Sequence, residues 1–194
     1  LELVSGLVGP ALDATLVRFA AQRITAARDA SLPYFQRMLR IKLVLALAMV
    51  VCGALLARPV LAFVIAPSAG DAIGPGGVML AFAGAALLTL LGYAQAYYQA
   101  HQRMARYALL ELANATLRLA LVAGALVLLT EPTASLLLGI YVASSALVVA
   151  GGFARLPREV FRRCVDETIS LAEPLRFAKW VVVAAACTTA AQRA

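Results

Sequence analysis

Charged residues are scarce in this 194-residue chain: Asp, Glu, Lys and Arg together make up 14% of it, whereas 63% of the residues are hydrophobic. Soluble domains carry about 25% charged and about 45–50% apolar residues. So few polar side chains do not suffice to cover a water-exposed surface. Disorder is excluded by the same numbers, because disordered chains are poor in apolar residues. We therefore expect a membrane protein.

Cysteine and histidine are also rare. The three cysteines, Cys52, Cys164 and Cys187, lie far apart, and the single histidine is His101. No CxxC or Cys/His spacing exists, so neither a disulfide framework nor a metal site is indicated. We expect the cysteines to be small apolar packing residues, the histidine to lie at the surface, and no metal or cofactor to be bound.

Long apolar runs dominate the chain, which has a mean hydropathy of +0.87. A transmembrane helix needs about 20 mostly apolar residues. The runs predict an all-α fold, a polytopic transmembrane helix bundle with about five complete spans and the start of a sixth. The predicted complete spans are residues 2–22, 41–66, 78–98, 107–129 and 134–154, and the sixth begins near Leu175.

The basic residues are distributed unevenly among the predicted connections. Thirteen of the 17 Lys and Arg residues fall in the first, third and fifth connections, and none falls in the second or fourth. The positive-inside rule places the basic connections in the cytoplasm. The net charge of +7 is therefore explained by basic residues that set the membrane orientation, and we expect no nucleic-acid partner. The thirteen are Arg23, Arg28, Arg37, Arg40, Lys42, Arg103, Arg106, Arg155, Arg158, Arg162, Arg163, Arg176 and Lys179.

Polar residues inside the fourth predicted span share one helical face. Glu111, Asn114 and Arg118 follow Tyr107 at i+4, i+7 and i+11. A charge at the centre of a spanning helix costs about 2.5–3.5 kcal/mol on insertion scales, so such residues tend to face a bundle interior or a hydrated cavity. We interpret the stripe as the lining of a cavity that meets an anionic substrate group. The alternative is a buried Glu–Arg interaction with another helix that only fixes packing.

Two residues of the first predicted span are further candidates for this cavity. Asp13 lies deep in the span, where it either lines the cavity or packs as a hydrogen-bonded acid. Arg18 lies one turn from the cytoplasmic end, where a guanidinium can also extend to the interface.

The end of the third predicted span supplies the last candidate, Gln95. With Gln99 and Gln102 it forms a strip at i, i+4 and i+7 that is able to form hydrogen bonds. The neighbouring tyrosines, at positions 93, 97 and 98, predict an aromatic belt at the membrane interface. The alternative is a sugar-stacking surface at the mouth of the cavity.

The fifth connection, residues 155–174, mixes charges with apolar residues near helical spacing. This pattern fits an amphipathic helix lying at the membrane surface. A charged linker between two halves of a transporter is compatible with the same residues.

Three stretches resemble one known family in order and spacing. LDATLVRFAAQR (residues 12–23) and YAQAYYQAHQRMARYALLELANATLRLALVAGALVLL (residues 93–129) are similar to the oligosaccharide flippases of bacterial polysaccharide synthesis. These flippases belong to the multidrug/oligosaccharidyl-lipid/polysaccharide exporter superfamily. LRFAKWVVVAAACTTAAQRA (residues 175–194) resembles the opening of the first helix in the second half of that family.

The resemblance implies a division of the chain within a two-lobe transporter. Residues 1–154 would be helices two to six of the N-terminal lobe, residues 155–174 a cytoplasmic inter-lobe linker, and residues 175–194 the start of the first helix of the C-terminal lobe. Because the chain begins at Leu1 and stops in an apolar run at Ala194, we expect an internal fragment of a longer protein.

The resemblance also implies a function. The family moves undecaprenyl-pyrophosphate-linked oligosaccharide, as in O-antigen and lipopolysaccharide synthesis, across the bacterial inner membrane. Expected partners are the lipid-linked oligosaccharide, membrane lipids and other polysaccharide assembly proteins. No bond of the substrate changes, so neither enzyme activity nor a catalytic residue is expected. The alternatives are a cation-coupled multidrug exporter of the same superfamily and a non-transporting membrane scaffold. The excess of arginines over acids inside the spans favours the flippase, because a guanidinium matches phosphate oxygens.

Overall fold

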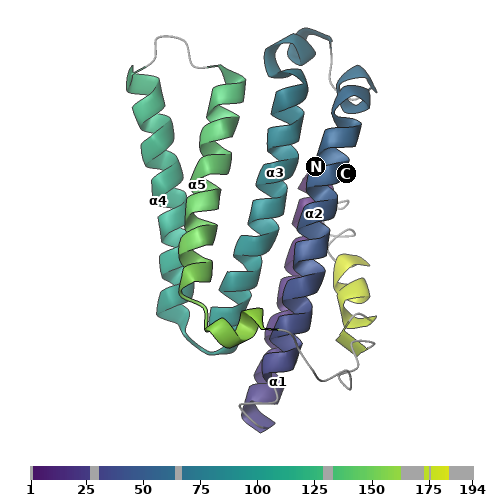
Figure 1. Cartoon of the computed structure of the whole chain (residues 1–194), viewed down its shortest axis with the longest axis vertical. Helices are drawn as coiled ribbons and strands as arrows, with labels where there is room; N and C mark the ends of the chain where they lie inside the picture. Colours follow the sequence, from purple (N-terminus) through teal and green to yellow (C-terminus); the bar gives the residue numbers. More distant parts are fainter. Residues whose placement is uncertain are drawn as a thin grey trace.

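A computed structural model describes residues 2–26, 31–63, 67–128, 133–162, 173–174 and 176–183. These residues form helices and turns and contain no strand, which confirms the all-α prediction. Figure 1 shows the arrangement of the helices. Their bounds are α1 Glu2–Ala26, α2 Leu32–Phe63, α3 Pro67–Ala100, α4 Met104–Leu128, α5 Ala134–Ala154 and the short 3-10 helix η2 Arg158–Phe161.

Four of the helices are long and apolar enough to cross a membrane. The apolar stretches are Leu32–Leu61, Gly74–Ala100, Met104–Leu128 and Ala134–Ala154. They lie in α2, α3, α4 and α5, so four of the five predicted complete spans meet this criterion. The predicted first span is helical as α1 but is not among the four.

The helix α2 begins at Leu32, nine residues before the predicted start of the second span. The prediction was wrong here because Arg37, Arg40 and Lys42 were read as loop residues. Buried apolar side chains recur among them at helical spacing, including Phe35, Met38 and Leu39. The helix therefore extends through the basic segment, with the apolar residues facing the bundle.

The helix α3 is the centre of the bundle. It packs against α1, α2, α4 and α5, while α4 also packs against α5 and η2 against α2. Small residues allow the close approaches that such packing requires. A Cβ built on Gly53 of α2 would lie 2.5 Å from Phe82 Cβ of α3, so a larger residue does not fit there.

The predicted aromatic belt is wrong, because the tyrosines near the end of α3 are core residues. Tyr93, Tyr97 and Tyr98 are all buried. The Tyr93 hydroxyl donates a hydrogen bond to the Phe35 carbonyl of α2, with an oxygen–oxygen distance of 2.9 Å. His101 is half-buried against Phe35 and Tyr97 rather than at the surface. These rings join α2 to α3.

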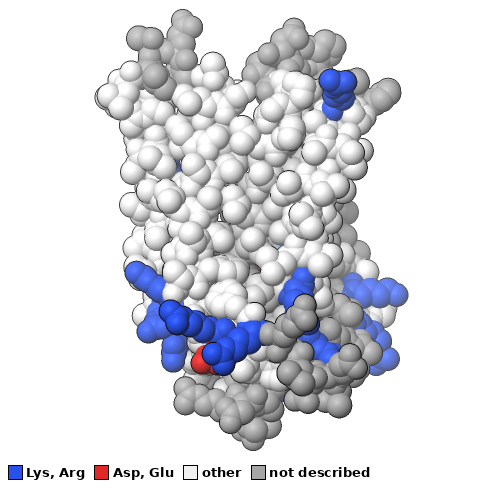
Figure 2. Space-filling model, viewed as in Figure 1, with Lys and Arg blue, Asp and Glu red and all other residues white. Residues whose placement is uncertain are grey.

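Basic side chains gather at one end of the molecule, as Figure 2 shows, and most of the face above them carries no charge. Large apolar side chains are exposed on the helices, among them Leu47 and Leu55 of α2 and Leu119 of α4. An extensive exposed apolar surface of this kind marks a membrane or partner interface rather than contact with water. Cys52 is also exposed on α2, so it does not pack as expected, and Cys164 and Cys187 lie outside the described residues.

The fifth connection is described only up to residue 162 and again from residue 173. Its first part is a turn followed by η2, in which Leu156 and Val160 are buried. The Gln36 amide of α2 donates to the Glu159 carbonyl at 2.7 Å. The start of the connection therefore packs on the bundle. The remainder of the predicted amphipathic helix, residues 163–172, lies outside the described residues.

Candidate functional site

A cavity of about 600 Å³ lies between α1, α3 and α4. Both α1 and α4 pack on α3, and their described residues make no close contact with each other. The face of α3 therefore forms the base, and α1 and α4 form the two walls. The lining residues are Pro10, Asp13, Ala14, Val17, Arg18, Gly92, Gln95, Ala96, Gln99, Tyr107 and Glu111.

Four of the six predicted site residues line this one cavity: Asp13, Arg18, Gln95 and Glu111. They come from three helices and from positions up to 98 residues apart in the sequence. The structure thus brings together polar residues that the sequence analysis selected separately in three predicted spans. Gln99 of the predicted strip also lines the cavity, whereas Gln102 lies in the α3–α4 turn with a φ of 55°.

One wall-to-base contact joins α3 to α4. The Gln95 side-chain amide donates a hydrogen bond to Glu111 Oε2 at 3.2 Å. Glu111 is exposed, and the described part of the chain gives it no ion pair. The same carboxylate also interacts with the Tyr107 hydroxyl, whereas the neighbouring Gln99 is exposed to the cavity. Tyr107, one turn before Glu111, adds an aromatic ring and a hydroxyl group to the lining.

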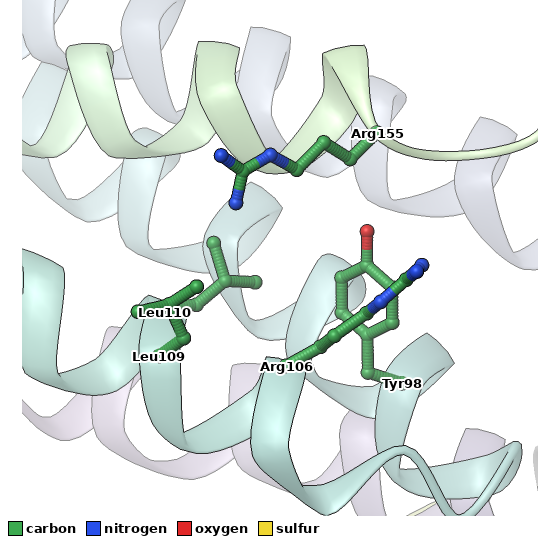
Figure 3. A pocket seen from close by; sticks show the side chains of 5 residues that line it. All are labelled: Tyr98, Arg106, Leu109, Leu110 and Arg155. Carbon is green, nitrogen blue, oxygen red and sulfur yellow. The ribbon is translucent and has the colours of Figure 1, made fainter.

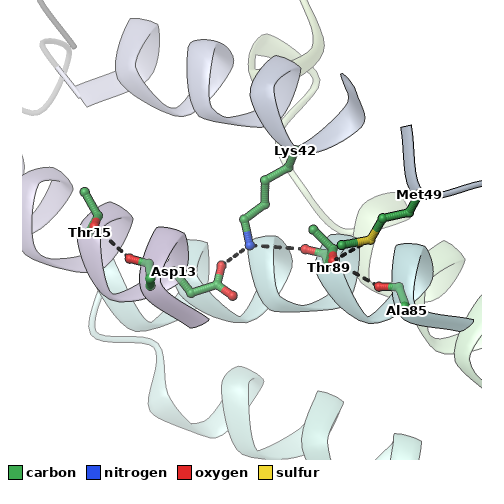
Figure 4. A network of polar contacts seen from close by, with 7 residues as sticks. Asp13, Thr15, Lys42, Met49, Ala85 and Thr89 are labelled. Atoms are coloured by element: carbon green, nitrogen blue, oxygen red, sulfur yellow. Dashed lines mark hydrogen bonds and ion pairs between the residues drawn. The ribbon is translucent and has the colours of Figure 1, made fainter. Parts of the chain in front are cut away.

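The opposite wall carries a buried ion pair. The Lys42 ammonium of α2 donates to the Asp13 carboxylate of α1 and, at 3.2 Å, to the Thr89 carbonyl of α3 (Figure 4). The Lys42 side chain is 0% exposed and that of Asp13 is 23% exposed. Both charges are therefore neutralised inside the bundle, as buried charges must be. The contact joins three helices at the edge of the cavity.

Gly92 of α3 makes room for the Asp13 carboxylate. A Cβ built at this position would overlap a carboxylate oxygen of Asp13. The absence of a side chain therefore allows α1 to lie against α3 with its acid directed toward Lys42. The prediction that Asp13 packs as a hydrogen-bonded acid agrees with this geometry. Asp13 also lines the cavity, as the other interpretation of this residue predicted.

Lys42 is the residue that the sequence analysis missed. It was assigned to the first basic connection, yet it is fully buried in α2. A signal for this placement exists in the sequence. Lys42 follows Met38 at i+4 and precedes Ala46 and Met49 at i+4 and i+7, and all three of those residues are buried. A lysine on the apolar stripe of a helix requires an acid on a neighbouring helix.

Arg18 lines the cavity from the end of α1 that lies nearer the basic connections. Its guanidinium carbon lies 4.5 Å from the Phe177 ring centroid and 5.8 Å from that of Phe19. Cation–π contacts of this length hold an arginine in place while leaving its N–H groups free to bind an acceptor. The described residues provide Arg18 with no acidic partner.

The other two predicted residues, Asn114 and Arg118, are not among the described residues that line the cavity. Arg118 lies seven residues beyond Glu111, about 10 Å along the helix axis. Its guanidinium carbon lies 3.9 Å from the Tyr141 ring centroid of α5. Glu111 and Arg118 therefore do not pair with each other, but each contacts another helix, Glu111 through Gln95 of α3 and Arg118 through Tyr141 of α5.

Buried polar atoms continue along α4 beyond Glu111. Asn114 Oδ1 and Arg118 Nε are both buried and make no hydrogen bond within the described structure. Unsatisfied buried groups of this kind cost free energy and often mark a position where a ligand or water completes the bonding. The polar stripe on α4 thus extends from the cavity toward the middle of the helix.

Comparison of the chain with protein-family models, curated proteins and solved structures finds no match.

Proposed function

We propose that this chain forms part of a membrane transporter that moves a lipid-linked oligosaccharide, such as one carried on undecaprenyl pyrophosphate, across the bacterial inner membrane. The observation that carries the proposal is the polar cavity between α1, α3 and α4, set in a bundle in which four helices, α2 to α5, are long and apolar enough to span a bilayer. Transport also fits the alternating-access architecture in which such a bundle is one of two lobes.

The chemistry of the lining supports a sugar as the transported group. Gln95, Gln99 and Glu111 present amide and carboxylate groups, and Tyr107 adds an aromatic surface. Hydroxyl groups of a sugar both donate and accept hydrogen bonds, and amides match both roles. Arg18, which has no acidic partner among the described residues, is placed to meet a phosphate oxygen.

Export of an organic cation is the second candidate. Glu111 favours it, because this carboxylate lies in the cavity and has no cationic partner among the described residues. A cationic substrate would need the charge of that carboxylate, whereas a sugar needs only an acceptor. The two candidates therefore differ at a single side chain.

The test uses the full-length protein in proteoliposomes that contain a lipid-linked oligosaccharide, with leaflet transfer read by lectin accessibility. Replacing Gln95 and Gln99 by leucine should lower transfer at least about tenfold, since two hydrogen-bonding partners are lost. Thr116→Val is the matched control, because Thr116 is exposed on α4 outside the cavity lining. Transfer unchanged in the double variant would contradict the proposal.

Glu111→Gln separates the two candidates. The amide retains a hydrogen-bonding oxygen but removes the charge. For oligosaccharide transport, this variant should keep most of the transfer activity. For cation export, it should lose efflux of an organic cation such as ethidium, measured in the same vesicles.

A further inference from the structure

A second cavity, of about 420 Å³, lies at the basic end of the bundle between α3, α4 and the end of α5. Figure 3 shows its lining side chains, which are Tyr98, Arg106, Leu109, Leu110 and Arg155. This cavity and the one described above lie on different faces of α4. Arg106, Leu109 and Leu110 point to one side of the helix, and Tyr107 and Glu111 point to another. The two cavities share none of the lining residues that the structure describes.

The Tyr98 hydroxyl is the first feature of this cavity that points to a bound anion. Tyr98 is only 2% exposed, and its hydroxyl oxygen is buried without a hydrogen-bond partner in the described structure. In Figure 3 the hydroxyl points from α3 toward the side of the cavity on which Arg155 lies. A buried hydroxyl left unsatisfied costs free energy, so an acceptor is expected at this position.

Two arginines border the same space. Arg106 lies beside Tyr98, with its guanidinium carbon 5.9 Å from the ring centroid, and Arg155 directly follows the last residue of α5. Neither forms an ion pair with a described acidic residue. Two guanidinium groups that have no described acidic partner and one hydroxyl donor thus line the same cavity, on either side of which the guanidinium groups lie (Figure 3), and their common complement is an anion with several oxygens.

The remaining lining is apolar. Leu110 is buried, whereas Leu109 is 50% exposed on the outer surface of α4. Cationic donors therefore lie next to an apolar surface, at the end of the bundle where charged side chains give way to uncharged ones (Figure 2). Basic pockets between helices at the cytoplasmic membrane interface are suited to acidic lipid headgroups.

We propose that Tyr98, Arg106 and Arg155 form a binding site for a phosphate group, supplied by the headgroup of an anionic phospholipid in the leaflet at the basic end. The phosphate oxygens accept hydrogen bonds from the Tyr98 hydroxyl and from the two guanidinium groups. An acyl chain of the lipid extends along Leu109. The site is independent of the transported substrate.

Tyr98→Phe tests the role of the hydroxyl. In lipid-free detergent, the variant should have an unchanged or higher Tm, because it loses only an unsatisfied buried group. The rise in Tm that phosphatidylglycerol causes in the wild-type protein should be reduced. A lower Tm without lipid, together with an unchanged response to phosphatidylglycerol, would assign Tyr98 to packing alone and overturn the proposal.

The double variant Arg106→Gln/Arg155→Gln tests the charge. Native mass spectrometry of the full-length protein should show phosphatidylglycerol binding at least about tenfold weaker than in the wild type, since two charged hydrogen bonds are lost. The matched control is Arg40→Gln/Arg158→Gln, which removes two exposed arginines outside this cavity. Equal losses in both double variants, or no loss in the first, would overturn the proposal.

Two further probes identify the source of the phosphate. Phosphatidylcholine should bind more weakly than phosphatidylglycerol, because its quaternary ammonium offsets the phosphate charge. Inorganic phosphate should compete only weakly, because it lacks the acyl chain that follows Leu109. Equal binding of the two lipids, or tight binding of inorganic phosphate without a preference for phosphatidylglycerol, would overturn the assignment to an anionic lipid.

Discussion

Lys42 of α2 is neutralised by Asp13 of α1, and the two side chains form the one ion pair that the described residues contain. The lysine also donates to the Thr89 carbonyl, so the pair is anchored to α3. Because Lys42 is 0% exposed, its charge has no access to water that would replace the acid. The pair therefore couples the position of α1 to that of α2 and α3.

Removing one member of this pair should destabilise the protein more than removing both. Breaking a buried pair on one side costs about 3–5 kcal/mol, whereas replacing both partners by apolar residues is often neutral. We expect Asp13→Leu to lower the Tm of the detergent-purified protein strongly, and Asp13→Leu/Lys42→Met to restore most of it. A double variant with a Tm as low as that of Asp13→Leu would show that the pair does not act as a unit.

Gly92→Ala should also destabilise the protein, through a steric effect on the same contact. The new methyl group would overlap the Asp13 carboxylate and push α1 away from α3. Gly124→Ala is the matched control, because a Cβ there meets nothing within 4 Å. Alanine favours a helix over glycine by about 0.8–1.0 kcal/mol, so the control should have an equal or higher Tm. Equal responses in thermal unfolding would contradict the close approach at Gly92.

The contact between Arg118 and Tyr141 predicts a coupled effect on stability. The guanidinium lies 3.9 Å from the ring centroid, a geometry worth about 0.5–2 kcal/mol. Tyr141→Phe keeps an aromatic face and should leave Tm nearly unchanged. Arg118→Met and Tyr141→Leu should each lower it, and combining them should lower it by less than the sum. Additive losses in this double-mutant cycle would mean that the two side chains do not interact.

Membrane orientation can be tested with two alanines that lie at opposite ends of the bundle. Ala105 and Ala134 are both exposed and lie in the first turns of α4 and α5. In a cysteine-free background, Ala134→Cys should react with an impermeant thiol reagent in intact cells. Ala105→Cys should react only after permeabilisation, because its end of the bundle carries the basic residues. The reverse pattern would invert the proposed orientation.

The all-helical fold and four of the six site residues could be predicted from the sequence, because both depend on local patterns of apolar and polar residues. Apolar length predicted α4 and α5 closely, whereas α3 begins at Pro67, 11 residues before the predicted start of its span. The cost of burying charge selected Asp13 and Glu111 as inward-facing. Both residues do line the cavity. A charged residue within an apolar helix can be recognised from that helix alone, without knowing which helix packs against it.

The partners of those residues could not be predicted, because they depend on how the helices pack. Glu111 and Arg118 share a helical face, yet the first bonds to Gln95 of α3 and the second stacks on Tyr141 of α5. Lys42 was missed for a related reason, since a cluster of nearby arginines resembles a loop until the apolar stripe among them is recognised. The tyrosines of α3 were misplaced because aromatic residues near a helix end suit an interface and a core equally.

The buried ion pair has a consequence for the order in which the protein is made. Asp13, Lys42 and Thr89 all precede Ala100, where α3 ends. A nascent chain inserting into the membrane from its N-terminus can therefore neutralise its buried lysine before α4 and α5 have been synthesised. Helices α1, α2 and α3 are able to dock first, and the hairpin of α4 and α5 then adds to a surface in which the buried lysine is already paired.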